Sequence, residues 1–89
     1  MKPFTVVWLK DALDALAETW MDYPDRTAVR AAASLIDRQL SEVPKLYGTH
    51  VSEGLWTISC EPLRAFYTIS EEDCRVDVAG LCLLSREGE

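Results

Sequence analysis

The sequence predicts an α+β domain in which a helical hairpin packs on one face of a curved, mainly antiparallel four-stranded sheet. Three observations predict this fold. A β-branched and aromatic run opens the chain at residues 4–8, two stretches of helical periodicity follow between residues 10 and 43, and a period of two dominates residues 55–84. The element order is therefore β-α-α-β-β-β, and the short links between the last three strands favour antiparallel pairing.

The first helix is predicted over residues 10–22, directly after the strand "FTVVW" at residues 4–8. Its apolar residues recur at helical spacing on one side, which we expect to face the core: Leu9, Leu13, Leu16, Ala17 and Trp20. Its carboxylates lie on the other side, which indicates a solvated face that can also steer a basic partner: Asp11, Asp14, Glu18 and Asp22.

The second helix is predicted over residues 26–43, with Asp25 as its N-terminal cap and Pro44 as its end. The link "DYPD" is short, so the two helices should lie antiparallel. We interpret "KLYGTHVSEG" as a loop and "LWTISC", "LRAFYTI" and "CRVDVAGLCLL" as the last three strands. The final strand is expected to place four residues on one face: Val76, Val78, Gly80 and Cys82.

Composition and charge limit the classes of function. Nine Lys and Arg stand against fifteen Asp and Glu, for a formal net charge of −6, which argues against broad binding to nucleic-acid phosphates. The length of 89 residues predicts a single domain over residues 1–89. The apolar runs are too short to span a membrane, and the first twenty residues do not have the pattern of a signal peptide, so we expect a soluble cytoplasmic protein. The three cysteines lack metal-ligand spacing, so we expect reduced thiols and neither metal nor cofactor.

The element order and three stretches resemble the RelE/ParE superfamily of toxins from type II toxin–antitoxin systems. The stretches are the opening strand that ends at Trp8 before "ALDALAETW", the helix end "LIDRQLSEVPKLYG", and "PLRAFYTISEEDCRVDVAGL", which looks like the family's Arg-x-x-Tyr strand, turn and valine-rich strand. The resemblance covers nearly the whole chain. It implies a toxin that a cognate antitoxin neutralises and that acts on ribosome-bound mRNA or on DNA gyrase.

The resemblance also implies a set of site residues. Arg64 stands at the position of the family's strand arginine, and Arg86 and His50 are further candidates for a catalytic role. Lys45 and Tyr67 are candidates for contacting the substrate. Metal-free cleavage of a phosphodiester needs groups that move protons and several cations that hold the developing charge. The last strand departs from the family pattern, because it ends in "GLCLLSREGE" and no tyrosine follows Tyr67.

Each candidate also has a purely structural interpretation. Arg64 can pair with a carboxylate such as Glu61 or Glu71, and a lone loop histidine such as His50 is commonly solvated. Three tryptophans are expected in the core rather than as a stacking platform: Trp8, Trp20 and Trp56. A second hypothesis is therefore a toxin-fold protein without catalysis, which binds only a protein partner or its own copy as a homodimer. A helix-free sheet face around Arg64 would favour the first hypothesis.

Overall fold

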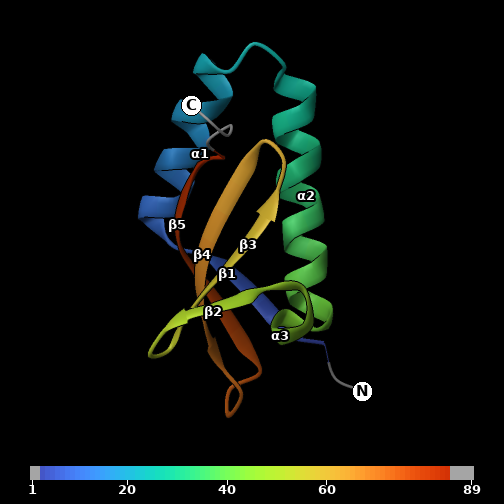
Figure 1. Cartoon of the computed structure of the whole chain (residues 1–89), viewed down its shortest axis with the longest axis vertical. Helices are drawn as coiled ribbons and strands as arrows, with labels where there is room; N and C mark the ends of the chain where they lie inside the picture. The colour runs from blue at the N-terminus through green and yellow to red at the C-terminus, as the bar shows by residue number, and fades with distance from the viewer. Residues whose placement is uncertain (1–2, 85–89) are drawn as a thin grey trace.

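The computed structural model describes residues 3–84 of the chain (Figure 1). The elements run in the order β1 (Thr5–Trp8), α1 (Lys10–Asp22), α2 (Arg26–Glu42), α3 (Pro44–Tyr47), β2 (Thr49–Ser52), β3 (Leu55–Cys60), β4 (Leu63–Ser70) and β5 (Arg75–Leu83). The strands form one five-stranded mixed sheet in the order β1-β5-β4-β3-β2. The α+β class is confirmed, whereas the predicted number of four strands is wrong.

The additional strand is β2, which lies in the segment 45–54 that the sequence predicts to be a loop; the short helix α3 also occupies the start of this segment, so the loop prediction is wrong for most of it. It pairs antiparallel with β3, with Thr49 opposite Thr57 and His50 opposite Trp56. All four residues of β2 are exposed, because the strand lies at the edge of the sheet. An exposed strand needs no alternation of apolar and polar residues, so the sequence lacks the signal that identified the other strands.

The first strand pairs in parallel with the last. β1 lies beside β5, with Thr5 opposite Arg75 and Trp8 opposite Val78, while the other three strand pairs are antiparallel. The hairpin of α1 and α2 provides the long connection out of β1. The second helix has the predicted cap, since the side chain of Asp25 accepts a hydrogen bond of 3.0 Å from the backbone N–H of Ala28.

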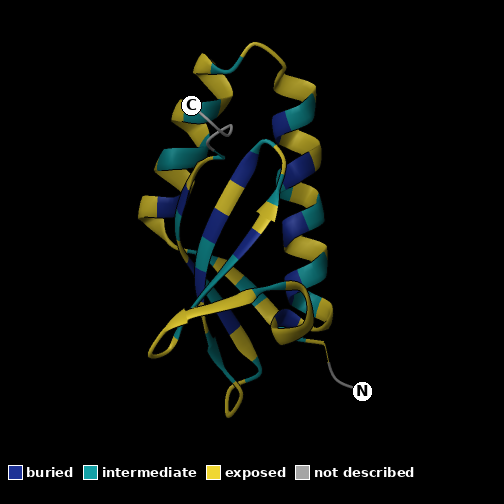
Figure 2. Ribbon diagram, viewed as in Figure 1, coloured by how far each residue is buried: buried dark blue, intermediate teal, exposed yellow. Residues whose placement is uncertain are grey.

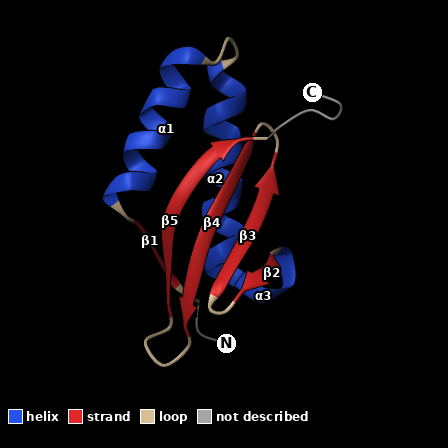
Figure 3. Ribbon diagram, turned by 60° about the vertical axis from the view of Figure 1, so that its left-hand side comes forward, coloured by secondary structure: helices blue, strands red, loops and turns tan. Residues whose placement is uncertain are grey.

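Both long helices cover the same face of the sheet (Figures 1 and 3). The buried residues of the helices join the buried residues of three strands in one core, as the dark segments of Figure 2 show: Ala12, Val29, Ala32, Ile36, Leu40, Ile58, Leu63, Ala65, Tyr67, Val76, Val78 and Leu81. The other face of the sheet is not covered by any element within residues 3–84. None of the helices in this range is long and apolar enough to cross a membrane.

The orientation of α1 differs from the prediction. Ala12 is fully buried against the sheet, whereas Leu13 is 50% exposed and Trp20 is 40% exposed. The side of α1 that carries Ala12 faces β5, because the small alanine side chain allows the helix to approach the sheet closely. The larger apolar residues therefore face the space between α1 and α2. The expectation that Leu13 and Trp20 lie in the core is wrong, whereas Leu16 is half-buried and packs against the core. The other two tryptophans expected there, Trp8 and Trp56, are also half-buried and pack against the core.

A bulge in β5 also changes which residues share a face. Phe66 pairs with Gly80 but Tyr67 pairs with Val78, so β5 has one extra residue, Ala79. Val78 consequently faces the core and Gly80 the other side. The prediction that Gly80 and Cys82 share a face with Val76 and Val78 is wrong, because an inserted residue reverses the alternation beyond it.

Candidate functional site

Arg64 lies on the helix-free face of the sheet, in the middle of three strands. Its neighbours across the sheet are Ser59 on β3 and Cys82 on β5, both exposed. Phe66, two residues further along β4, lies half-buried on the same face. Arg64 is exposed and takes part in none of the ion pairs found within residues 3–84. Its guanidinium is therefore available to an external anion.

A second arginine on the same face is already neutralised. Arg75 donates from Nε to Oδ1 of Asp77 at 3.0 Å and from Nη2 to Oδ2 at 3.3 Å. This fork-shaped pairing uses the geometry by which an arginine also binds a phosphate. Of these two arginines, Arg75 has a carboxylate partner, and Arg64 has none among the described residues.

Tyr67 lies on the opposite face from Arg64 and is fully buried. Its hydroxyl donates a hydrogen bond of 2.7 Å to the backbone carbonyl of Pro44, at the start of α3. Burial raises the pKa of Tyr67 to about 12. Gly48 passes directly over the ring edge, since a Cβ atom there would lie 1.6 Å from the Tyr67 hydroxyl. The Tyr67 side chain therefore connects α3, and Gly48 just before β2, to the sheet.

The remaining sequence candidates are dispersed. The exposed His50 ring meets Trp56 edge-on, with ring centroids 5.1 Å apart, on the face opposite Arg64. Lys45 forms an ion pair of 2.6 Å with Glu71 in the turn after β4. Arg86 lies outside the described residues. Within residues 3–84, the structure thus does not bring the predicted cations and proton-transfer groups together around Arg64.

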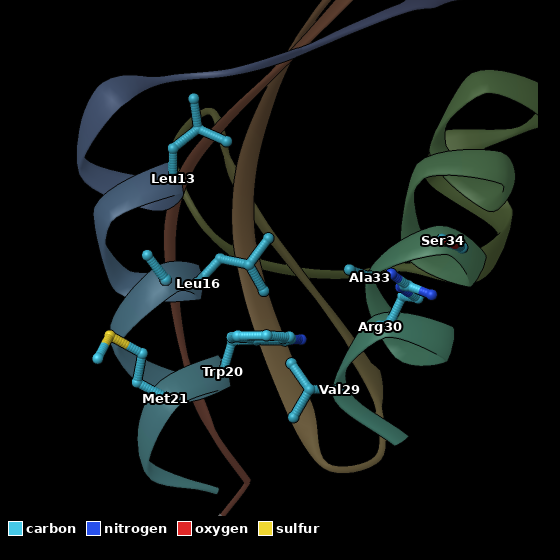
Figure 4. A pocket seen from close by; sticks show the side chains of 9 residues that line it. Leu13, Leu16, Trp20, Met21, Val29, Arg30, Ala33 and Ser34 are labelled. Atoms are coloured by element: carbon cyan, nitrogen blue, oxygen red, sulfur yellow. The ribbon is translucent and has the colours of Figure 1, made fainter. Parts of the chain in front are cut away.

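A groove between α1 and α2 is the second candidate site (Figure 4). It has a volume of about 510 Å³, and its lining is almost entirely apolar: Leu13, Leu16, Ala17, Trp20, Met21, Val29, Arg30, Ala33 and Ser34. A smaller hollow of about 340 Å³ shares four of these residues and extends the groove toward Trp8 and Asp37. We call both together the interhelical groove. Met21 on its rim is 68% exposed, so large apolar side chains are left in contact with water.

The Trp20 indole in this groove is held in place by an arginine. The guanidinium of Arg26 lies 4.6 Å from the centroid of the Trp20 ring, and its Nε donates a hydrogen bond of 3.1 Å to the Trp20 carbonyl oxygen. At the other end of the groove, the Trp8 indole donates to Oδ1 of Asp37 at 3.1 Å. The indoles at the two ends of the groove are therefore each positioned by a contact with a charged side chain of α2.

The sequence singles out Arg64 but favours its pairing with a carboxylate such as Glu61 or Glu71, and this expectation is wrong within residues 3–84, where Glu71 pairs with Lys45 instead. No groove is predicted from the sequence. The apolar stripe of α1 predicts a core-facing side, because amphipathic helices usually bury such a stripe. The available signal was the pair Ala12 and Ala15, which mark a second, smaller apolar side of the same helix. A helix with two apolar sides can bury only one of them against a single sheet.

Comparison with solved structures identifies the fold. The chain superposes on the toxin–antitoxin complex RelBE2 from Mycobacterium tuberculosis with a TM-score of 0.80 and 19% sequence identity, over 97% of both chains. It superposes on the archaeal RelE–RelB complex from Pyrococcus horikoshii with a TM-score of 0.66 and 14% identity, over 96% of this chain and 99% of the other. The ParDE system from P. aeruginosa gives a TM-score of 0.63 and 16% identity, over 92% of this chain and 97% of the other.

The chain therefore has the fold of RelE and ParE toxins, as the sequence resemblance implied. No protein-family model matches it, and no curated protein matches it significantly in sequence. At such low identity the structural likeness concerns the path of the chain rather than its chemistry.

Proposed function

We propose that this chain is the toxin component of a RelE/ParE-type type II toxin–antitoxin system and that a cognate antitoxin neutralises it in the cytoplasm. The fold supports this proposal, since it is shared over nearly the full length with chains solved in toxin–antitoxin complexes. The observation that carries it is the interhelical groove, where Leu13, Trp20 and Met21 remain exposed. A preformed apolar groove of this size fits a stable protein partner better than it fits solvent.

The toxic action is assigned to the helix-free face around Arg64. An unpaired guanidinium beside the half-buried Phe66 offers a cation and an aromatic surface to a target, which is ribosome-bound mRNA or DNA gyrase. Arg86 is proposed as a second cation from beyond β5. His50 and Lys45 remain weaker candidates, because neither neighbours Arg64 in the sheet.

A second candidate function is a toxin-fold protein that binds partners without catalysis. The charge of the helix-free face favours it, because Arg75 is bound to Asp77 and leaves Arg64 as the available arginine within the described residues. Metal-free phosphodiester cleavage needs more than one cation at the reacting phosphate. The two functions share the antitoxin groove and differ in whether Arg64 matters for toxicity.

Induced expression without a partner tests the proposal. The wild-type chain should arrest growth, and co-expression of the small open reading frame next to its gene should relieve the arrest. Arg64→Ala should lose the arrest, while Arg38→Ala, an exposed arginine on α2 outside both candidate sites, should keep it. Harmless expression of folded wild-type protein contradicts the toxin proposal and favours the partner-binding alternative.

The mode of arrest identifies the target. Cleavage within messages in the A site of the ribosome, mapped by primer extension, indicates mRNA as the target. Loss of DNA supercoiling and induction of the DNA-damage response, with translation still active at first, indicate gyrase. Arrest that persists in Arg64→Ala would show that the toxic surface lies elsewhere.

A further inference from the structure

The second arginine of the helix-free face is held by a carboxylate of its own strand. Arg75 and Asp77 lie two residues apart on β5, so both side chains are on this face. The guanidinium bonds both oxygens of the carboxylate, from Nε at 3.0 Å and from Nη2 at 3.3 Å. A carboxylate bound in this way occupies the donors with which the arginine would otherwise bind a phosphate.

A row of side chains on β4 connects the two arginines. Arg64, Phe66 and Thr68 alternate along the helix-free face, and the row ends where Ser70 lies opposite Arg75. The distance along the strand from Arg64 to Ser70 is roughly 20 Å, which is too long for both guanidiniums to hold one phosphate. An aromatic ring between two cations is an arrangement that suits single-stranded nucleic acid, whose bases stack on the ring while its phosphates meet the cations.

Asp77 lies on this row, where it interferes with a chain of phosphates. It is opposite Thr68 in the sheet, between Phe66 and Arg75 along the direction of the strands. The side chains of Arg75 and Asp77 are 46% and 25% exposed, so water reaches the ion pair and its strength is modest. A phosphate that reached Arg75 would have to break this pair and would then meet the carboxylate at close range. Asp77 therefore opposes such a phosphate both by competition and by repulsion.

The other carboxylates near Arg75 do not have this contact. The turn after β4 contains Glu71, Glu72 and Asp73, which give this end of the sheet a negative field. Glu71 pairs with a lysine of α3, and Asp73 accepts a hydrogen bond of 3.1 Å from a serine hydroxyl of β4. Among the described residues, Asp77 is the carboxylate that is bonded to the guanidinium of Arg75.

We propose, resting on the function proposed above, that Asp77 is an internal competitor that masks Arg75 as the second cation of a surface for single-stranded RNA. With the mask in place, the helix-free face offers Arg64 to such a chain and holds it weakly. Without the carboxylate, Arg64 and Arg75 hold two phosphates of one chain, with Phe66 under the bases between them. Asp77 thus determines how readily this face binds RNA, and it does so through Arg75.

Fluorescence anisotropy with a labelled oligouridylate of roughly eight nucleotides tests the mask on the full chain. Asp77→Asn keeps the size of the side chain and removes its charge, so it should bind the RNA about fivefold or more tighter than wild type at low salt. The slope of log affinity against log salt should steepen by about 0.7, the value for one further phosphate of a single strand. Asp77→Thr should show the same gain, and adding Arg75→Gln to Asp77→Asn should abolish it.

Two matched variants separate the mask from the overall charge. Asp73→Asn removes the same charge from the same end of the sheet but releases no arginine, so it should change the affinity by less than about twofold. Asp14→Asn breaks the exposed ion pair of 2.9 Å with Lys10 on α1 and should leave the affinity unchanged. A gain in Asp77→Asn that is no larger than the gain in Asp73→Asn overturns the inference.

A labelled oligoglutamate of the same charge identifies the kind of chain that binds. If Asp77→Asn gains as much affinity for this peptide as for the RNA, the surface takes an acidic protein segment and the RNA inference is overturned. Failure of wild type and every variant to bind the RNA overturns it as well. A wild-type chain that arrests growth in either case keeps the proposed toxin function, whereas harmless expression together with the full RNA gain contradicts the toxin function alone.

Discussion

Removing the hydroxyl of Tyr67 tests whether this residue has a structural role rather than a role in target binding. The hydroxyl is buried and donates at 2.7 Å to the Pro44 carbonyl, which would be left without that bond in Tyr67→Phe. Leaving a buried carbonyl unpaired costs about 1 to 3 kcal/mol of the free energy of unfolding. For a chain of this size that corresponds to a fall of roughly 5 to 20 °C in Tm.

Thermal and urea unfolding followed by circular dichroism measure this loss. Tyr47→Phe is the matched control, since Tyr47 is 42% exposed and should change stability by less than about 0.5 kcal/mol. Below its lowered Tm, Tyr67→Phe should still arrest growth. A Tyr67→Phe variant with wild-type stability would refute the proposal that the hydrogen bond to Pro44 stabilises the packing of α3 on the sheet. A folded variant that no longer arrests growth would instead support the substrate contact that the resemblance implied.

A double-mutant cycle with Gly48 sharpens the test. A methyl group at Gly48 would meet the Tyr67 hydroxyl at 1.6 Å and ring atom Cζ at 2.8 Å, so Gly48→Ala should destabilise by about 1 to 3 kcal/mol or more. Tyr67→Phe removes the closest of these contacts. The two changes should therefore couple by about 1 kcal/mol or more, and strictly additive effects would contradict the observed geometry.

Three further predictions concern individual side chains. Asp25→Ala should cost about 0.5 to 2 kcal/mol in urea unfolding, because it removes the cap on the backbone N–H of Ala28. Burial raises the pKa of Tyr67 from 10.0 to about 12, so the phenol loses its proton less readily in the folded chain than in the unfolded chain. The free energy of unfolding should therefore be unaffected by this group below pH 10 and fall by roughly 2 to 3 kcal/mol between pH 10 and 12. Tyr67→Phe should not show this fall. Burial also raises the pKa of the Cys60 thiol, so iodoacetamide at pH 8 should alkylate Cys60 more slowly than the exposed Cys82, as measured by peptide mass spectrometry.

The local elements follow from the sequence because their causes are local. The strand "TVVW" is β-branched, Asp25 caps α2 with its own side chain, and Pro44 ends that helix. The alternation along β4 likewise indicates that Arg64 and Tyr67 lie on opposite faces of the strand, and the structure has Arg64 exposed and Tyr67 buried. These features depend on residues within a few positions of one another, which is the range over which sequence patterns are informative.

The partner surface depends on how α1 packs. Its sequence shows an apolar stripe through Leu13 and Trp20, together with Ala12 on a smaller apolar side. Only close packing against β5 decides that Ala12 is buried and that Leu13 and Trp20 remain for a partner. Burial on either side satisfies the same periodicity, so the pattern alone cannot choose between them.

The sequence by itself determined the order and type of most elements, the cap of α2 and the position of Arg64 and Tyr67 on opposite faces of one strand. Only the tertiary structure decided the edge strand β2, the parallel pairing of β1 with β5, and the bulge at Ala79 that reverses the faces of β5. It also decided that His50 lies on the opposite face from Arg64. The physical reason is that pairing, register and the facing of helices are set by contacts between residues far apart in the chain, which no local pattern encodes.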